Sequence, residues 1–557
     1  MGLVEDLGEM RDLLSASRRL ATRATDEAHF AAACFRAGIF GLDPPARLAR
    51  MARVFERYGL LSATLAVSAL RHADQVAIRD ERGELTYREL DEQTNALANA
   101  WRSEGLVAGE GVAILARNHR GFVQAVFAAA KCGAKIILLN TSFAGPQIRE
   151  VAQREGTEML VFDEEYAEML GDVEPPRGRW RAWVEDGSDA DPAPDTLAAL
   201  IARGSSAEPP RPARNPRIVI LTSGTTGTPK GAPRDEPRSL GIIGGVLSKV
   251  PFRARETTVI GAPMFHAFGF AGMALALALG STIVVHRRFD PRATLDALAD
   301  NDASAMVLVP VMLQRIMELG PDEVRARDLR ALRIIFVSGS AVSADLARRT
   351  LQAFGPVLYN LYGSTEVAEA TIATPEDLAI DPTTVGSAVR GTVIKILDEH
   401  GREVPAGVTG RIFVANGAQF EGYTGGEDKE RIGALMSSGD VGHLDGDGRL
   451  YIDGRDDEMI VSGGENVFPA EVEDLLCGHE AIAEAAAIGV ADETFGQRLR
   501  AFVVVRDGHE LSEDVVKDYV KANLARYKVP REVVFVAELP RNQTGKVLKR
   551  RLAERDD

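Results

Sequence analysis

Short runs of apolar, mostly β-branched residues recur along the chain and predict buried strands. Eight such runs lie between residues 112 and 337: VAILA, KIILL, MLVF, RIVIL, TTVIGA, STIVV, AMVLV and RIIFV. Amphipathic helical stretches such as GFVQAVFAAAKCG and PRATLDALAD separate several of them. Strands that alternate with helices predict an α/β architecture of layered subdomains with largely parallel sheets.

The pattern changes after about Gly391, where the strand-like segments VIKILDEHGREV, GRIFVAN and GRLYIDGR are separated by glycine turns. Beyond Arg455 a last unit of about 100 residues has a pattern of strand, helix, strands, helix and strand, and its size suits a small domain. We therefore expect an α/β fold with a large N-terminal domain, which includes a β-rich subdomain, and a small mobile α+β C-terminal domain. The predicted boundaries are 1–67 for a helical N-terminal extension, 68–454 for the large domain and 455–557 for the small one.

Two segments raise the question of a membrane. The run 267–285 carries no charge, but its ALGST sequence ends a helix and leads into the strand TIVV, which favours two buried elements over a transmembrane span. The first eighty residues have a helical pattern, with Arg18, Arg19 and Arg23 near apolar leucines. We expect a helical cap packed on the chain's own core, because most amphipathic helices face a core. Peripheral contact with a membrane surface is the alternative.

Composition narrows the class of protein. Of the 557 residues 45% are hydrophobic and 26% charged, as in ordinary globular proteins. The net charge of -16 argues against a nucleic-acid partner. Cys34, Cys132 and Cys477 lie far apart and match no metal or disulfide spacing, and the N-terminus lacks the apolar core of a signal peptide. These features lead us to expect a cytoplasmic protein.

The stretch LTSGTTGTPKG, residues 221–231, follows the run RIVIL and has the composition of a phosphate-binding loop. Gly224 and Gly227 allow backbone N–H groups to approach an anion, and Lys230 adds a positive charge. Hydroxyl donors come from Thr222, Ser223, Thr225 and Thr226. The stretch does not match the pattern G-x-x-x-x-G-K-[ST], because proline precedes the lysine and glycine follows it. On its own it fits a structural turn equally well.

Three further motifs carry candidate chemistry. LYGSTE, residues 361–366, places a ring, a hydroxyl and a carboxylate close together, which suits a base, a phosphate and Mg²⁺. Between 438 and 473, Asp440 and Arg455 are candidate ribose ligands, and SGGEN forms a glycine turn. Near the end, PRNQTGKVLKR carries Lys546. Taken singly, the three also fit a strand end, an acidic surface turn and a solvated basic helix.

In this order and spacing the four motifs resemble the adenylate-forming superfamily of acyl-CoA synthetases, luciferases and peptide-synthetase adenylation domains, most of all the bacterial fatty-acyl-CoA synthetases. The resemblance extends from about Ser68 to the C-terminus. It implies that the loop at 221–231 holds the β- and γ-phosphates of ATP, which leave as pyrophosphate. The implied nucleotide-binding residues are Thr222, Ser223, Gly224, Thr225, Thr226, Gly227, Lys230, Gly339, Ser340, Ala341, Tyr362, Gly363, Ser364, Asp440 and Arg455.

The resemblance also implies individual roles around the nucleotide. Tyr362 would lie against adenine, and Asp440 would bind both ribose hydroxyls with help from Arg455. Thr365 would contact the α-phosphate, and Glu366 would hold Mg²⁺.

Four further residues would serve the acid, the hinge and the second substrate. His266 would line the acyl pocket, although a buried core histidine is the alternative. The small domain would rotate about Asp457, and Gly463 and Gly464 would lie beside the coenzyme A tunnel.

The implied reaction has two steps. A carboxylate attacks the α-phosphorus of ATP to give an acyl adenylate, and a thiol then attacks the carbonyl carbon. Charge develops on the phosphoryl oxygens in the first step, so Mg²⁺ on one side and the catalytic Lys546 on the other would stabilise its transition state. The sequence ends eleven residues after Lys546 without an appended carrier domain, so we expect the thiol to be coenzyme A. A fatty acyl-AMP ligase that passes its product to a carrier protein is the alternative.

The segment FHAFGFAGMALALALG is apolar and rich in small residues, which predicts a channel for an alkyl tail. It offers no charge for an amino group or a second carboxylate. We therefore expect a medium- or long-chain fatty acid, with an aryl acid as the alternative. A nucleotide-binding regulator without catalysis would be expected to have lost Glu366 or Lys546, and both are present.

Overall fold

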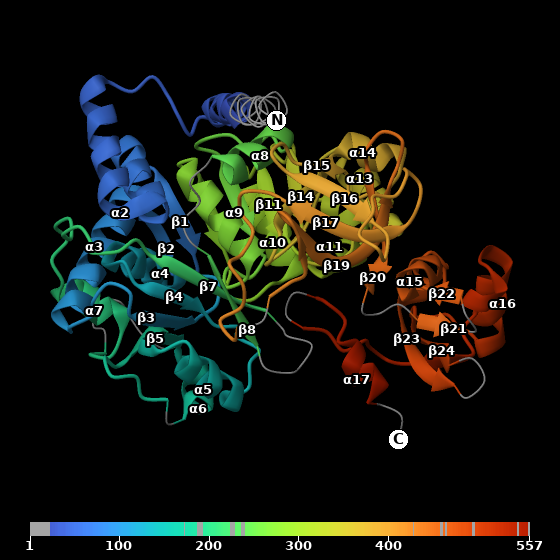
Figure 1. Ribbon diagram of the computed structural model, residues 1–557. Coiled ribbons are helices and arrows are strands. Elements are labelled where there is room, and N and C mark those ends of the chain that lie inside the picture. The colour runs from blue at the N-terminus through green and yellow to red at the C-terminus, as the bar shows by residue number, and fades with distance from the viewer. Residues whose placement is uncertain are drawn as a thin grey trace, which may run out of the picture.

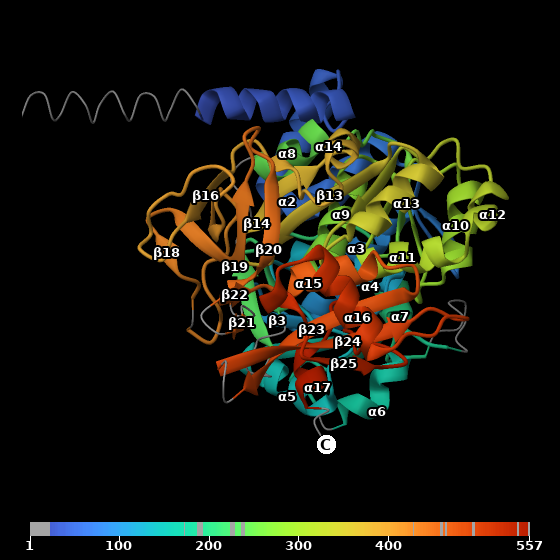
Figure 2. The ribbon, with the colours of Figure 1, turned by 90° about the vertical axis from the view of Figure 1, so that its right-hand side faces the viewer.

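The computed structural model describes residues 23–171, 173–185, 193–222, 229–234, 240–426, 428–456, 460–462, 465–492, 496–542 and 545–554. A large α/β part carries the N-terminal and central elements, and a smaller part with the last strands and helices lies against one side of it (Figure 1, Figure 2). The predicted fold class is confirmed.

The largest sheet has nine strands in the order β15-β14-β13-β12-β11-β9-β10-β1-β2. Its strands are β1 (Val76–Asp80), β2 (Gly83–Thr86), β9 (Thr257–Ile260), β10 (Thr282–Val285), β11 (Ala305–Leu308), β12 (Ile334–Val337), β13 (Leu358–Ser364), β14 (Ala368–Ala373) and β15 (Ser387–Ala388). Neighbouring strands are parallel from β13 through β12, β11, β9 and β10 to β1. The pairs β1–β2, β13–β14 and β14–β15 are antiparallel. Ligands of such sheets bind at the carboxyl ends of the parallel strands.

A second sheet has six strands in the order β6-β5-β3-β4-β7-β8. Its strands are β3 (Gly111–Leu115), β4 (Lys135–Leu138), β5 (Thr157–Asp163), β6 (Arg179–Trp183), β7 (Arg217–Thr222) and β8 (Lys230–Arg234). Only β8 is antiparallel to its neighbour. All eight apolar runs predicted as strands are strands of these two sheets, as expected for buried parallel strands, whose sequences are continuously hydrophobic.

Helices connect these strands and pack on the sheets. They are α3 (Tyr87–Ser103), α4 (Arg120–Cys132), α5 (Gly145–Arg154), α6 (Ala167–Leu170), α7 (Leu197–Arg203), α8 (Gly241–Lys249), α9 (Ala267–Ala278), α10 (Pro291–Asp300), α11 (Pro310–Glu318), α12 (Pro321–Arg325), α13 (Ala344–Phe354) and α14 (Pro375–Ile380), with the short 3-10 turn η1 (Glu164–Tyr166). The uncharged run 267–285 forms α9 and β10, as predicted. No helix within the described ranges combines the length and apolarity that a membrane span requires.

The predicted N-terminal extension, 1–67, contains a helix at residues 23–37 and most of the long helix α2 (Pro45–His72), which continues past the predicted boundary. Ser68 of α2 donates a hydrogen bond to the carbonyl oxygen of Leu277 over 2.7 Å, which fixes α2 on the core. These contacts agree with the expected helical cap, while residues 1–22 lie outside the described part. The prediction of helix throughout the first eighty residues is wrong at Val76–Asp80, because β1 pairs there with β10.

The remaining strands form two five-stranded sheets. The β-rich sheet consists of β16 (Val393–Leu397), β17 (Gly410–Ala415), β18 (Arg431–Ile432), β19 (Leu435–Leu444) and β20 (Leu450–Arg455). The smaller part contains β21 (Ile460–Ser462), β22 (Glu465–Val467), α15 (Pro469–Cys477), β23 (Ile482–Asp492), β24 (Gly496–Val505), α16 (Glu513–Asn523), η3 (Arg526–Lys528), β25 (Glu532–Phe535) and α17 (Lys549–Ala553). It has a hydrophobic core of its own.

Candidate active site

A cavity of about 1860 Å³ is lined by both parts of the molecule. Every predicted site residue whose side chain or glycine position the structure describes lines it: Lys230, His266, Gly339, Ser340, Ala341, Tyr362, Gly363, Ser364, Thr365, Glu366, Asp440, Arg455 and Lys546. Thr222 is described only by its backbone, as the last residue of β7. Outside the described residues lie Ser223, Gly224, Thr225, Thr226, Gly227, Asp457, Gly463 and Gly464.

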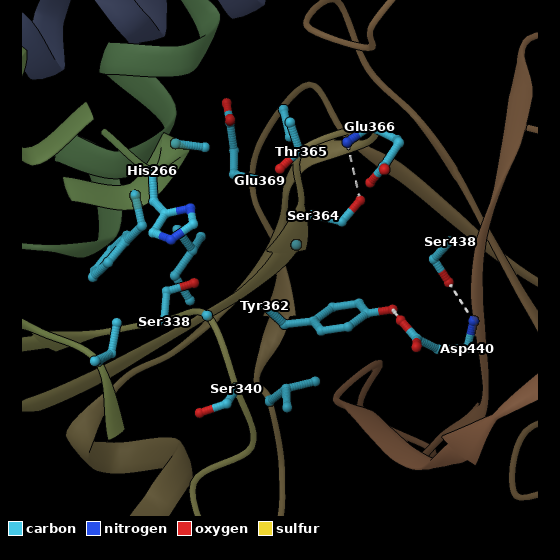
Figure 3. A pocket seen from close by; sticks show the side chains of 18 of the residues that line it. His266, Ser338, Ser340, Tyr362, Ser364, Thr365, Glu366, Glu369, Ser438 and Asp440 are labelled. Atoms are coloured by element: carbon cyan, nitrogen blue, oxygen red, sulfur yellow. Dashed lines mark hydrogen bonds between the residues drawn. The ribbon is translucent and has the colours of Figure 1, made fainter. Parts of the chain in front are cut away.

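Tyr362 and Asp440 come from different sheets and meet in this cavity (Figure 3). The Tyr362 hydroxyl donates a hydrogen bond to Oδ2 of Asp440 over 2.6 Å. Burial and the neighbouring Asp440 carboxylate raise the pKa of Tyr362 well above its ordinary value, so the phenol stays protonated and donates. The Tyr362 ring and the Asp440 carboxylate therefore hold each other in a fixed orientation.

Arg455 reaches Asp440 because the two residues are cross-strand partners of β20 and β19. Nη1 of Arg455 lies 3.1 Å from Oδ1 of Asp440. Gly439 precedes the aspartate with φ of 83°, and a Cβ atom there would lie 3.4 Å from Nη2 of Arg455. Glycine is favoured at such a φ and leaves room for the arginine. The carboxylate is thus presented to the cavity with one oxygen paired to a cation and the other to a phenol.

Glu366 follows β13 in a tight connection to β14. The Ser364 hydroxyl accepts hydrogen bonds from the N–H groups of Glu366 and Val367, each over 3.2 Å. At Gly363 a Cβ atom would lie 1.9 Å from the Ala368 carbonyl oxygen, so the connection requires glycine there. This turn directs the Glu366 carboxylate into the cavity.

Tyr423 contacts two charged residues of the site. Its hydroxyl donates to Oε1 of Glu366 over 2.6 Å, and Nζ of Lys230 lies 5.4 Å from the centre of its ring. A carboxylate and an ammonium group are therefore held near one ring, beside the strand β7 that leads into the glycine-rich loop. This arrangement suits a triphosphate whose charge is shared between a metal ion and a lysine.

The chemistry of Glu366 fits a magnesium ion that arrives with ATP. Mg²⁺ in such sites is bound by one or two carboxylates and by substrate phosphates. Within the described ranges no group of three or more His, Cys, Asp or Glu residues could hold a metal ion without a substrate. Glu366 lines the cavity beside Lys230, which agrees with a metal ion held jointly by a carboxylate and by substrate phosphates.

Lys546 enters the cavity from the C-terminal segment. A turn forms there because the Lys546 N–H donates to Oδ1 of Asn542 and the Asn542 N–H donates to the Lys546 carbonyl oxygen, both over 2.9 Å. Gly545 has φ of 79°, and a Cβ atom on it would lie 2.2 Å from Cγ1 of Val311 at the start of α11. The turn therefore packs directly against the large part, and only glycine permits the contact.

Arg234 and Glu369 line the same cavity and were not predicted from the sequence. Arg234, the last residue of β8, donates to the Thr365 carbonyl oxygen. Burial raises the pKa of Glu369 and lowers that of Arg234. The two follow the phosphate loop and the Glu366 motif by a few residues, which is the signal that could have identified them. The cavity therefore contains ionisable, polar side chains that the apolar segment itself lacks.

His266 precedes α9 and lies among apolar neighbours. Burial lowers its pKa to about 4, and its Nε2 atom is buried with no hydrogen-bond partner among the described residues. The ring centre lies 4.5 Å from that of Phe265. The imidazole is therefore neutral near pH 7 and contributes a flat, weakly polar surface to the cavity.

The apolar part of the cavity lies between α8 and α9. Its lining includes Leu240, Ile242, Ile243, Val246, Ala267, Phe268, Phe270, Ala271, Ala274 and Leu275. Several of the α9 residues are alanine, so their side chains leave the space unfilled. At Gly269 a Cβ atom would lie 2.2 Å from the Pro263 carbonyl oxygen, so glycine is required where the helix begins close to the preceding loop.

The fold and the site together define an adenylate-forming ligase, which joins an acid to the thiol of coenzyme A or of a carrier protein. Residues 65–424 match the AMP-binding enzyme family, and residues 471–546 match the AMP-binding enzyme C-terminal domain. The chain belongs to this family.

Known members of the family differ in the acids they use. The chain is 29% identical to the fatty acid–[acyl-carrier-protein] ligase ScoC of Streptomyces coeruleorubidus, over 86% of this chain and 93% of that protein. It is 32% identical to the indoleacetate–CoA ligase of Aromatoleum aromaticum, over 86% of this chain and 95% of that protein. The chain also aligns with the structure of the o-succinylbenzoate CoA synthetase MenE of Bacillus subtilis in complex with the acyl-adenylate intermediate OSB-AMP. The TM-score is 0.75 and the identity 25%, over 88% of this chain and 97% of that chain. The class of acid is therefore open within the family.

Tyr362→Phe should raise the KM for ATP about tenfold and change kcat little. The variant removes a hydrogen bond to a charged group, which contributes roughly 1.5–3 kcal/mol, and leaves the Asp440 carboxylate less well oriented. A residue that positions the nucleotide equally in ground and transition states affects KM and not kcat. Steady-state kinetics at varied ATP measures both. Tyr451→Phe is the matched control, because Tyr451 also lines the cavity but belongs to the β-rich sheet. An unchanged KM for ATP would contradict this orientation of Asp440.

Proposed function

We propose that the protein is a fatty-acyl-CoA synthetase. It activates a medium- or long-chain fatty acid with ATP to an acyl adenylate and transfers the acyl group to coenzyme A, giving acyl-CoA, AMP and pyrophosphate. The observation that supports this proposal is the continuity of the cavity, in which the charged cluster around Tyr362 and the apolar space beside α9 form one volume.

In this proposal the nucleotide binds across the carboxyl ends of the nine-stranded sheet. Asp440 accepts hydrogen bonds from the ribose hydroxyls, and Arg455 and Tyr362 hold its carboxylate in place. The segment Gly339 to Ala341 borders adenine. Lys230 and the loop that follows β7 bind the β- and γ-phosphates, and Mg²⁺ at Glu366 supplies positive charge beside them.

The first chemical step joins the acid to AMP. A carboxylate oxygen attacks the α-phosphorus, the bond from the α-phosphorus to the bridging oxygen breaks, and pyrophosphate leaves. Thr365 donates to the α-phosphate and Lys546 neutralises charge on the reacting oxygens, a stabilisation that grows in the transition state. In the second step the thiol sulfur attacks the carbonyl carbon, the thiol proton is lost, and AMP leaves.

The second step requires a thiol to reach the adenylate. We propose that the small domain, 455–557, rotates about Asp457 relative to the large domain, 68–454, and that Gly463 and Gly464 border the path of coenzyme A. The contact of Gly545 with Val311 supports an adenylate-forming arrangement for the structure described, since it places Lys546 at the cavity.

We expect the kcat/KM for straight-chain fatty acids to exceed that for benzoate, coumarate and indoleacetate. An apolar space lined by small residues suits a flexible chain, and each added methylene that fits contributes favourable burial. Pyrophosphate release with and without coenzyme A, and acyl-CoA formation with coenzyme A, measure the preference. A ring acid that surpasses every alkyl acid would contradict the substrate class. Pyrophosphate release without acyl-CoA would contradict coenzyme A as the acceptor and favour a carrier protein.

An aryl-acid CoA ligase is the second candidate. It is favoured by Arg234 and Glu369, because polar groups inside the cavity can bind substituents that an alkyl chain lacks. The likeness to an indoleacetate–CoA ligase points in the same direction.

A further inference from the structure

The wall of the cavity includes residues that precede the segment matched to the family, which begins at residue 65. Leu60, Leu61 and Thr64 of α2 line the same cavity as His266 and Lys546. Leu61 and Thr64 are buried, and Leu60 is half-buried. The N-terminal extension therefore contributes directly to the volume in which the acid is proposed to bind.

A bend in α2 brings these residues to the cavity. Gly59 has φ of 75° and ψ of -177°, which interrupts the helix one residue before Leu60. Only glycine adopts such a conformation at low cost. After the bend Leu61 packs in one hydrophobic cluster with Phe265 and Phe270, which flank the start of α9. The bend thus directs the second half of α2 towards the apolar part of the site.

The helix at residues 23–37 packs against α8, and residues of α8 line the same space. Phe30 packs on α8, where a Cβ atom at Gly244 would lie 2.4 Å from the Phe30 Cβ. The adjacent α8 residues Ile243 and Val246 line the cavity. Nη1 of Arg71 donates to the Ile39 carbonyl oxygen over 2.6 Å and ties the segment after this helix to α2. Both described helices of the extension therefore adjoin the apolar part of the site.

We propose that Leu60, Leu61 and Thr64 form the end wall that meets the hydrocarbon portion of the acid farthest from its carboxylate. The extension then limits the longest acid that the enzyme accepts. This inference rests on the proposed function for the choice of an alkyl acid. With a ring acid the same wall limits the size of a substituent opposite the carboxylate.

Substitution of Leu60 by a larger and by a smaller side chain tests the proposed end wall. Leu60→Trp should fill the space and move the kcat/KM optimum towards shorter acids. For the longest acid, kcat/KM should fall about tenfold or more, because one methylene in an apolar pocket changes kcat/KM by roughly 10- to 200-fold. Leu60→Ala should move the optimum towards longer acids. The assay compares even-numbered straight-chain acids from butyrate to stearate. Leu48→Trp and Leu48→Ala are matched controls, because Leu48 lies on the same helix before the bend, is 48% exposed and does not line the cavity.

The outcomes separate this inference from the proposed function. The proposal that Leu60 forms part of the end wall is wrong if both Leu60 variants have the same chain-length profile as the Leu48 controls. Activity of the wild type on ring acids alone contradicts the fatty-acid proposal. In that case the wall proposal is tested by the ratio of kcat/KM for para-butylbenzoate to kcat/KM for benzoate. The proposal is supported if Leu60→Ala raises this ratio, and it is wrong if the ratio does not change. Thermal denaturation checks that each variant folds, and if Leu60→Trp does not, Leu60→Ala decides alone.

Discussion

Lys546→Ala is expected to slow acyl-adenylate formation by about a hundred- to a thousandfold. The lysine is placed at the cavity by the turn that contacts Val311, and its proposed task is to neutralise charge as the carboxylate attacks the α-phosphorus. Removal of one preorganised group that acts in the transition state typically has an effect of this size. Pyrophosphate release from fatty acid and ATP measures the first step directly.

The same variant should convert a supplied acyl adenylate and coenzyme A to the thioester at a rate near that of the wild type. Lys546 has no proposed part in the second step, which is proposed to follow a rotation of the small domain. Lys549→Ala is the matched control, because Lys549 also lines the cavity but its Nζ lies 2.9 Å from the Glu473 carboxylate. Unimpaired pyrophosphate release by Lys546→Ala would remove this residue from the mechanism, and equal loss in both steps would indicate a structural role.

Glu366→Gln is expected to lower kcat by several hundredfold or more and leave the fold intact. A metal ion at phosphoryl oxygens contributes several kcal/mol of transition-state stabilisation, and the amide is a far weaker ligand than the carboxylate. Glutamine has nearly the same volume and its amide oxygen can still accept the hydrogen bond from Tyr423. The loss should therefore come from the missing charge and not from rearrangement.

Turnover measured against Mg²⁺ concentration distinguishes these causes. The variant should require more Mg²⁺ for half-maximal rate, while its thermal denaturation matches that of the wild type. Glu403→Gln is the control, since Glu403 pairs with Lys395 at the surface and does not line the cavity. Near-normal turnover at limiting Mg²⁺ would exclude Glu366 as the metal ligand.

Much of the fold could be predicted because its central strands are buried on both faces. Such strands have continuous hydrophobic sequences, as RIIFV and AMVLV do, and these runs are visible without any knowledge of the partner strands. The strand β1 was mistaken for helix because its partner β10 is distant in the chain. Local pattern cannot show a pairing of that kind, which is decided by tertiary contact.

The site could be predicted only where a motif holds several groups together. LYGSTE and the lysine near the C-terminus were identified in this way. The hydrogen bond between Tyr362 and Asp440 joins residues 78 positions apart, and it depends on how two sheets face each other. Arg234 and Glu369 were missed although each follows a motif by a few residues, because the sequence does not show whether a charged residue on a strand faces a cavity or solvent. The bend at Gly59 that brings Leu60 to the cavity has no local signal except the glycine itself.

The pairing of β1 with β10 has a consequence for the order in which the protein folds. The Thr282 hydroxyl donates to the Val76 carbonyl oxygen, and the two residues are 206 positions apart. At a synthesis rate of about 5 to 20 residues per second, β1 leaves the ribosome roughly 10 to 40 s before β10. During that interval the apolar side of α2 has no α9 to cover it, which favours chaperone binding and exposes the nascent chain to aggregation. The cavity can therefore close only late in synthesis, although the residues proposed as its end wall are among the first parts to be made.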